Sequence, residues 1–167
     1  VRYPLIVMAY QNQYDKTGAA SANGARAEEK FKQSIETFFG GTVTDASLSE
    51  QYSHIDFSCD VKFKVDVKSM KDPNTIWIEL KNVKGDDGWL YGEASHFAFE
   101  RHNCFLVVSQ SNLISLVDAK VDMKTIVDKA DDCLYKLYTR SNRKDLLTKL
   151  RPTDLTLIPY FLITKFN

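Results

Sequence analysis

The stretch SHIDFSCDVKFKVDVKSM, residues 53–70, alternates apolar and polar residues with the period of two that is typical of a β-strand. Because successive side chains of a strand point to opposite faces, this stretch predicts one apolar row and one charged row. The apolar row is Phe63, Val65 and Val67, and the charged row is Lys62, Lys64, Asp66 and Lys68. With the apolar row facing the core, a carboxylate and an amine remain together on the other face.

Around this stretch the sequence predicts a meander of short strands at 42–48, 52–59, 62–70 and 75–82. The last two are joined by KDPN, a turn sequence built on Asp and Pro. One register of this hairpin places Asp66 opposite Glu79, where two carboxylates would repel unless a cation lay between them. The other register pairs Asp66 with Lys81 and Lys68 with Glu79, and the alternation favours neither.

A helix is predicted over 24–39, because its apolar residues follow helical spacing, Asn23 can cap it and two glycines end it. Residues 1–23 are predicted to be a flexible lead-in, and the apolar run at 4–10 is too short to span a bilayer. Further helices are predicted at 89–101, 110–118 and 122–138, and strands at 104–109 and 155–165.

The length of 167 residues, with 44% hydrophobic and 26% charged residues, predicts one globular domain over 24–167. Zero net charge argues against binding polyanions through bulk charge, so local clusters matter more. One such cluster between Leu134 and Pro152 predicts either phosphate contacts of a DNA-binding surface or a solvated helix face. Its members are Lys136, Arg140, Arg143, Lys144, Lys149 and Arg151.

The three cysteines, Cys59, Cys104 and Cys133, have no disulfide or zinc spacing, so buried free thiols and a cytoplasmic location without membrane attachment are expected. The three histidines, His54, His96 and His102, do not share a metal-binding spacing. The aromatic residues of the middle of the chain are expected to fill the core rather than to stack on bases. They are Trp77, Trp89, Tyr91, Phe97 and Phe99.

Glu28 is the exceptional residue of the predicted helix, because it shares the apolar stripe with Phe31 and Ile35. A carboxylate at the edge of a core-facing stripe needs a partner. Since the helix precedes the strands that bear Asp56 and Asp66, a cation shared by these carboxylates is a reasonable partner.

These residues together resemble the signature of the PD-(D/E)XK nuclease superfamily. Asp56, nine intervening residues and Asp66-Val67-Lys68 match its metal-binding motif, with isoleucine before Asp56 where the family has proline. GARAEEKF, residues 24–31, is similar to the first-helix motif of the archaeal-type Holliday junction resolvase branch, in which Glu28 takes the glutamate's place. WIELKNVKGDDGWLYGEASHFAFE, residues 77–100, is similar to a segment of phage and plasmid members.

This resemblance implies an α/β fold with a restriction-endonuclease-like αβββαβ core, a mixed sheet flanked by helices. It also implies a Mg²⁺-dependent endodeoxyribonuclease, in which Mn²⁺ can replace Mg²⁺. Such an enzyme would act as a homodimer on branched DNA in the cytoplasm, which is the host cell's cytoplasm if the protein is phage-encoded. Asp56, Asp66 and Glu28 with the Val67 carbonyl would hold the metal, and Lys68 would orient the attacking water or stabilise charge on the phosphate.

Three alternatives remain open at the level of sequence. Asp66, twelve intervening residues and Glu79-Leu80-Lys81 also fit the motif, although this frame leaves Asp56 and Lys68 without roles. The substrate of the nuclease could instead be linear DNA, as for a restriction or repair enzyme. An inactive DNA-binding protein on the same scaffold is the alternative from another functional class.

Overall fold

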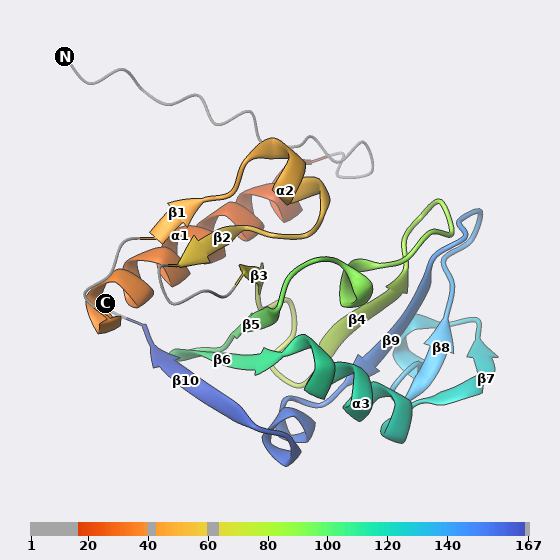
Figure 1. Ribbon diagram of the computed structural model, residues 1–167. Helices are drawn as coiled ribbons and strands as arrows, with labels where there is room; N and C mark the ends of the chain where they lie inside the picture. Colours follow the sequence, from red (N-terminus) through yellow and green to blue (C-terminus); the bar gives the residue numbers. More distant parts are fainter. Residues whose placement is uncertain (1–16, 40–42, 60–63, 166–167) are drawn as a thin grey trace.

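The computed structural model of the chain describes residues 17–39, 43–59 and 64–165, which form an α/β fold with two mixed sheets (Figure 1). The expectations for residues 1–16, including the apolar run at 4–10, and for Lys62 and Phe63 lie outside the described residues. Within the described ranges, no helix has the length and apolar character needed to cross a membrane.

The larger sheet has six strands, and all its neighbours are antiparallel except β3 and β5, which are parallel. Its order is β1 (Val43–Asp45), β2 (Phe57–Cys59), β3 (Lys64–Lys68), β5 (His96–Glu100), β6 (Cys104–Ser109) and β10 (Tyr160–Thr164). The smaller sheet has the order β4 (Ile76–Lys81), β9 (Leu146–Leu150), β8 (Lys136–Tyr138) and β7 (Asp122–Val127).

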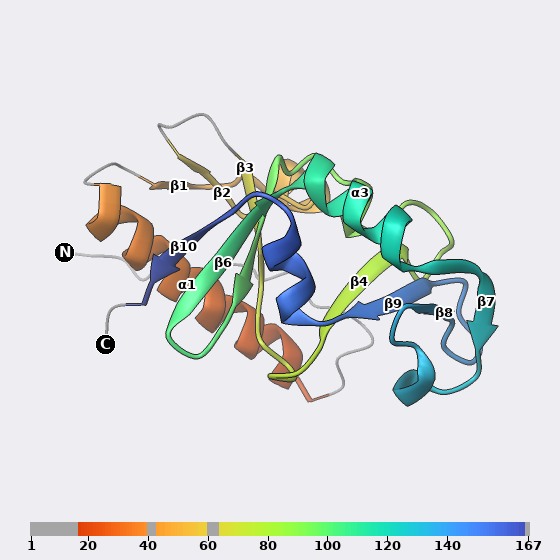
Figure 2. The same cartoon turned by 90° about the horizontal axis from the view of Figure 1, so that it is seen from below.

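The helices are α1 (Ala19–Phe39), α2 (Leu48–Tyr52) and α3 (Gln110–Lys120), with three short 3₁₀ helices, η1 (Trp89–Tyr91), η2 (Ala130–Asp132) and η3 (Pro152–Leu157). Helix α1 lies along the six-stranded sheet, and α3 lies on the side where the smaller sheet is found (Figures 1 and 2).

One apolar layer lies between α1 and the six-stranded sheet. Ala27, Phe31 and Ile35 of α1 pack there against strand residues that include Val65 and Val67. The Phe31 ring stacks on that of Phe57 at a centroid distance of 6.2 Å and meets that of Phe105 edge-on at 5.1 Å. This layer confirms the helical stripe and, for Val65 and Val67, the apolar row of the opening stretch, and it directs Asp66 and Lys68 to the opposite face.

The second apolar layer lies on that opposite face, where α3, η1 and the smaller sheet cover the larger one. Phe97 and Phe99 of β5 belong to this layer, together with Trp89 of η1. Because Asp66 is paired with Phe97 and Lys68 with Phe99, the two charged side chains enter a largely apolar layer.

The predicted hairpin of 62–70 with 75–82 is wrong, and so are both of its registers. Strand β4 leaves the six-stranded sheet and pairs with β9, while β3 takes β5 as its parallel neighbour. Alternation fixes which face of a strand is buried, but it does not say which strand lies beside it.

Two predicted helices are also wrong. Residues 89–101 contain only the 3₁₀ turn η1 and then β5, a strand buried on both faces that lies between β3 and β6. Residues 122–138 form β7, η2 and β8. A short apolar run that is covered on both sides loses its period of two, which is why spacing alone misassigned 96–100.

The other expectations for secondary structure hold more closely. Helix α3 confirms the helix at 110–118, β6 confirms the strand at 104–109, and 155–165 divides into part of η3 and β10. Helix α1 begins at Ala19, so Asn23 lies inside the helix and is not its cap. Tyr52 belongs to α2, which Ser47 caps with its side chain, rather than to the strand that ends at Cys59.

Candidate metal and catalytic site

Strand β3 places Asp66 in the middle of the six-stranded sheet, between β2 and β5. The residue is only 3% exposed. Its Oδ1 lies 2.7 Å from Nζ of Lys68, two residues further along the same face. Its Oδ2 is buried and has no hydrogen-bond partner among the residues that the structure describes. An unpaired carboxylate oxygen in an apolar layer is costly, so this atom marks a place where a ligand would stabilise the protein.

Asp56 comes just before β2 and is fixed to β3 by two hydrogen bonds. Its backbone N–H donates to the carbonyl oxygen of Val65 at 2.8 Å. Its Oδ2 accepts from the backbone N–H of Val67 at 2.6 Å. The side chain is therefore held against the same strand that carries Asp66 and Lys68.

Helix α1 brings the third carboxylate, Glu28, to this group. Burial is the main cause that raises the pKa of Glu28 to about 7, and the charge of Asp56 adds to it while that of Lys68 opposes it. The carboxylate of a helix packed on the sheet thus lies within electrostatic reach of both strand residues.

The pKa values of the two aspartates are shifted in the same direction. Burial, and then the charge of Asp66, raise the pKa of Asp56 to about 7. Burial raises the pKa of Asp66 to about 6, although the charge and hydrogen bond of Lys68 act against this rise. Three carboxylates that resist ionisation because they are buried near one another would be stabilised by a cation among them.

These residues suit a hard divalent cation by the chemistry of their donors. Carboxylate oxygens are the ligands that Mg²⁺ and Mn²⁺ prefer, and the unbonded Oδ2 of Asp66 has a free acceptor site. Within 17–39, 43–59 and 64–165, however, no three His, Cys, Asp or Glu side chains are grouped closely enough to hold a metal as they stand. Glu28 or Asp56 would therefore have to approach Asp66 when the ion binds.

Lys68 is surrounded by more groups than its motif predicts. Its Nζ lies 4.4 Å from the centroid of the Trp89 ring. Burial raises the pKa of Glu79 in β4, and the charge of Lys68 acts against this rise. Burial, followed by the charge of Lys68, lowers the pKa of His54 to about 4, so this imidazole is neutral beside the ammonium group.

The alternative motif frame is split by the fold. Glu79 is half-buried near Lys68 and accepts a hydrogen bond from the backbone N–H of Trp89. Lys81 is exposed at the end of β4, after an irregularity in the pairing with β9. The fold thus brings Glu79 of the alternative motif, but not Lys81, toward Lys68. Lys68 therefore has acidic neighbours on both sheets, Asp66 on the larger and Glu79 on the smaller.

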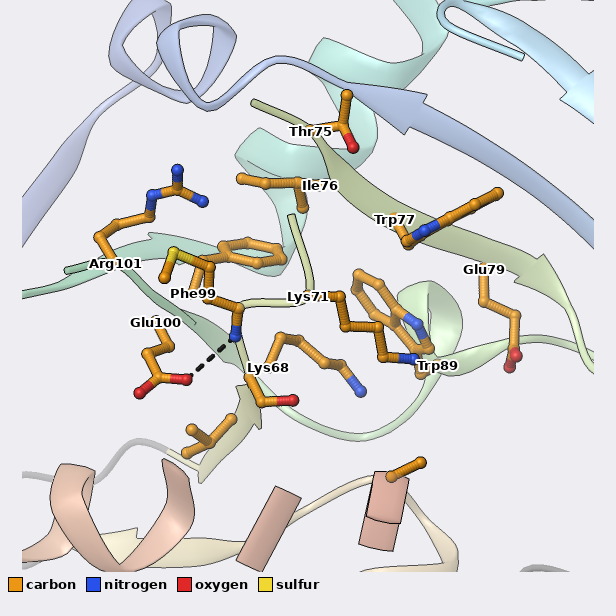
Figure 3. Close-up of a pocket in the computed structure, with 14 residues that line it drawn as sticks. Lys68, Lys71, Thr75, Ile76, Trp77, Glu79, Trp89, Phe99, Glu100 and Arg101 are labelled. Atoms are coloured by element: carbon orange, nitrogen blue, oxygen red, sulfur yellow. Dashed lines mark hydrogen bonds between the residues drawn. The ribbon is translucent and has the colours of Figure 1, made fainter. Parts of the chain in front are cut away.

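A cavity of about 290 Å³ lies where the two sheets meet, and of the candidate site's charged side chains Lys68 lines it, whereas Asp56, Asp66 and Glu28 do not. Figure 3 shows Lys68 and Lys71 extending into the space between Phe99 on one side and Trp77 and Glu79 on the other. Lys68 therefore belongs both to the candidate site and to the cavity, since its ammonium group binds Asp66 while its side chain lines the cavity. Trp89 and His54 were not predicted to join this site, because neither belongs to the metal-binding motif of Asp56, Asp66 and Lys68.

Glu100, at the end of β5, contrasts with these three carboxylates. Burial raises its pKa, but the hydrogen bonds from Arg26, Lys165 and the backbone N–H of Met70 outweigh this and hold the pKa at about 2. Arg26 donates to both carboxylate oxygens, at 2.8 and 2.7 Å, and Nζ of Lys165 lies 2.9 Å away. A buried carboxylate with such partners is a structural ion pair rather than a site for a cation.

The basic residues predicted to bind DNA lie on β8, on β9 and in the segments that follow them, so a solvated helix face is excluded. Arg140 forms an ion pair with the buried Asp145 and is therefore structural. Lys149 places its Nζ 4.5 Å from the centroid of the Trp77 ring, beside the cavity. Arg143 is half-buried, and Lys144 and Arg151 are exposed.

Of the cysteines, Cys133 is buried and free, as expected, and Cys104 is free but half-buried. The side chain of Cys59 lies outside the described residues. Comparison of the chain with protein-family models, with curated proteins and with solved structures gave no match.

Proposed function

We propose that this protein is a Mg²⁺-dependent endodeoxyribonuclease whose catalytic group is Asp56, Asp66, Lys68 and Glu28. The observation that carries the proposal is the buried Asp66 carboxylate: one of its oxygens binds Lys68, and the other has no partner within the described part of the chain. A protein stabilised only by packing would gain nothing from that arrangement, because a buried unpaired acceptor costs free energy. Functional sites are where such costs are found.

The order of the secondary structure supports the proposal. Helix α1 and the antiparallel strands β1, β2 and β3, followed by a parallel step to β5, correspond to the first elements of an αβββαβ core. The element between β3 and β5 differs from that plan, because β4 and η1 stand where its second helix is expected.

The chemistry follows from the positions of the side chains. When bound, the metal ion would polarise the phosphate and lower the pKa of a water molecule that attacks it. Asp66 and Asp56 would hold the ion from β3 and from the residue before β2, with Glu28 at the margin and the Val67 carbonyl as a further oxygen. Lys68, displaced from Asp66 by the ion, would place its ammonium group beside the phosphate or the attacking water.

The natural substrate in this proposal is branched DNA, and the active species is a homodimer. A junction is resolved by two symmetrical cuts, which a two-fold symmetric dimer makes with two copies of one site. A linear-duplex nuclease with the same catalytic group is the competing function within this chemistry.

An inactive DNA-binding scaffold has an observation in its favour. Lys68 already neutralises Asp66, and in the described part of the chain no three candidate ligands are close enough to hold an ion. If the protein binds DNA but does not cleave it, the Lys68–Asp66 pair is a structural ion pair.

The decisive experiment compares cleavage of a four-way junction and of a linear duplex of the same sequence, with Mg²⁺ or Mn²⁺. Asp66→Asn and Lys68→Met are expected to lower the cleavage rate by at least about 100-fold, the usual range for an acid–base or charge-stabilising group. Lys64→Met is the matched control, because Lys64 is exposed on the same strand.

The outcomes separate the three functions. Cleavage lost in Asp66→Asn and Lys68→Met but kept in Lys64→Met supports the nuclease, and preference for the junction supports the resolvase. Cleavage that persists in folded Asp66→Asn protein contradicts the assignment. Binding without cleavage by the wild-type protein favours the inactive scaffold.

A further inference from the structure

The cavity that Lys68 lines combines apolar walls with charged side chains of both signs, namely the cations Lys68, Lys71 and Arg101 and the carboxylates Glu79 and Glu100. Its walls include Trp77 of β4, Trp89 of η1 and Phe99 of β5, and Lys71 and Arg101 lie at its edge (Figure 3). At about 290 Å³, it is at the small end of the range of ligand pockets, which begins near 300 Å³. It therefore suits one planar ring system rather than an extended ligand.

Trp77 is the aromatic residue of this wall that remains accessible. Trp89 and Phe99 are only 8% and 2% exposed, whereas Trp77 is half-buried. Its indole ring is already fixed by the ammonium group of Lys149, at 4.5 Å, and by the tilted ring of Tyr138, at 6.2 Å. An aromatic residue that is held in place before a ligand arrives loses little conformational entropy on binding.

The three cations that line the cavity differ in whether they already have a polar partner. Arg101 donates to the carbonyl oxygen of Pro73, and Lys68 is paired with Asp66. Lys71 is exposed, and among the residues that the structure describes it has no hydrogen-bond or ion-pair partner. Lys71 is therefore the cation that is free to bind an anion at the edge of the cavity.

We propose that this cavity binds an unpaired nucleobase of DNA, with Trp77 contacting the base and Lys71 its phosphate. Aromatic side chains beside a cation form the usual site for single-stranded nucleotides, because every base has a π-face and every nucleotide a phosphate. The inference rests on the proposed nuclease function, since Lys68 joins the cavity to the carboxylates. It specifies the substrate further, as DNA with an unpaired nucleotide next to the phosphate that is cut.

Binding can be measured without catalysis through the intrinsic fluorescence of the protein. The chain has two tryptophans, and both line this cavity. In EDTA, a short oligodeoxythymidylate is expected to quench the emission, whereas an abasic strand of the same length is expected to quench it much less. Thymidine monophosphate is a second probe, which distinguishes a free nucleotide from one within a strand.

Two variants test the assignment of residues, with one control. Trp77→Ala should weaken binding of the oligonucleotide by about 5- to 100-fold, measured by anisotropy of a labelled strand, the effect of losing one base–aromatic stack. Lys71→Ala, in an exposed loop where folding is not at risk, should weaken it and reduce its salt dependence. Lys124→Ala, an exposed lysine of β7, should bind as the wild-type protein does.

Equal binding of the abasic strand, or unchanged binding by both Trp77→Ala and Lys71→Ala, would overturn this inference. If the wild-type protein cleaves DNA while Trp77→Ala and Lys71→Ala show no change in preference for an unpaired nucleotide, the cavity proposal fails and the nuclease stands. If the base-dependent binding is found but the wild-type protein does not cleave, the nuclease fails and the cavity stands.

Discussion

Asp66→Asn should stabilise the metal-free protein at neutral and alkaline pH. Burial holds the pKa of Asp66 at about 6, above its ordinary value of 3.8, in spite of Lys68. A tenfold change in proton affinity is worth about 1.4 kcal/mol, so the ionised carboxylate lowers the free energy of unfolding by about 3 kcal/mol above pH 6. An amide has the same shape and no charge, and removes this cost.

The dependence on pH has a definite sign. Below the ordinary pKa of 3.8, Asp66 is protonated in both the folded and the unfolded protein and costs nothing. As the pH rises from 3.8 to about 6, the unfolded state ionises first, and the folded state loses stability relative to it. The advantage of Asp66→Asn over the wild type should therefore be absent near pH 3.5, grow up to about pH 6 and then stay constant.

Glu100→Gln provides a matched control of opposite sign. Its partners hold the pKa of this equally buried carboxylate at about 2, below its ordinary 4.5, so ionised Glu100 stabilises the fold above pH 4.5 and loses this effect as the pH falls toward 2. Glu100→Gln should thus lower the free energy of unfolding at pH 8 by about 3 kcal/mol.

The assay is urea unfolding in EDTA between pH 3.5 and pH 8, followed by tryptophan fluorescence. A stabilisation of about 3 kcal/mol corresponds to a melting temperature roughly 6–12 °C higher for a protein of this size. If Asp66→Asn destabilises the protein at pH 8 as Glu100→Gln does, the Lys68–Asp66 pair is a net stabilising contact and the reasoning is refuted.

Three further results are expected. Mn²⁺ at pH 8, at 100 times its dissociation constant, should stabilise the wild type by about 2.7 kcal/mol and so raise its melting temperature. This rise should vanish in Asp66→Asn, and an equal rise in both proteins would place the ion elsewhere. Gly88→Ala should destabilise the protein by about 1–3 kcal/mol and so lower its melting temperature, because the added Cβ would overlap the carbonyl oxygen of Glu79; an unchanged melting temperature would contradict that contact. Arg140→Ala should destabilise the protein by about 1–3 kcal/mol, because it leaves the buried Asp145 without its ion pair. Lys144→Ala, the control, should leave stability unchanged. Equal melting temperatures of the two variants would show that Arg140 is not structural.

The candidate site was predictable from the sequence where its residues share one strand. The period of two placed Asp66 and Lys68 on one face of 62–70, and the structure joins them by an ion pair. The helical stripe singled out Glu28 because a carboxylate among apolar residues needs a partner. Its approach to Asp56 depends on how α1 packs on the sheet, which spacing within the helix does not determine.

Trp89, His54 and Glu79 come to Lys68 by the packing of the fold alone. Trp89 is carried there by the loop after β4, and Glu79 by a strand of the other sheet. Contacts of this kind join residues far apart in the chain. Their formation depends on which strands become neighbours, and no local pattern records it.

Local spacing was enough to predict the alternation that buries one face of β3, the apolar stripe of α1 and the residues of the charged row. Tertiary structure decided that β5, rather than β4, lies beside β3, and that 96–100 is a strand and not part of a helix. The physical reason is that local spacing sets which side of an element is apolar, whereas its neighbours are selected by burial of the whole chain at once.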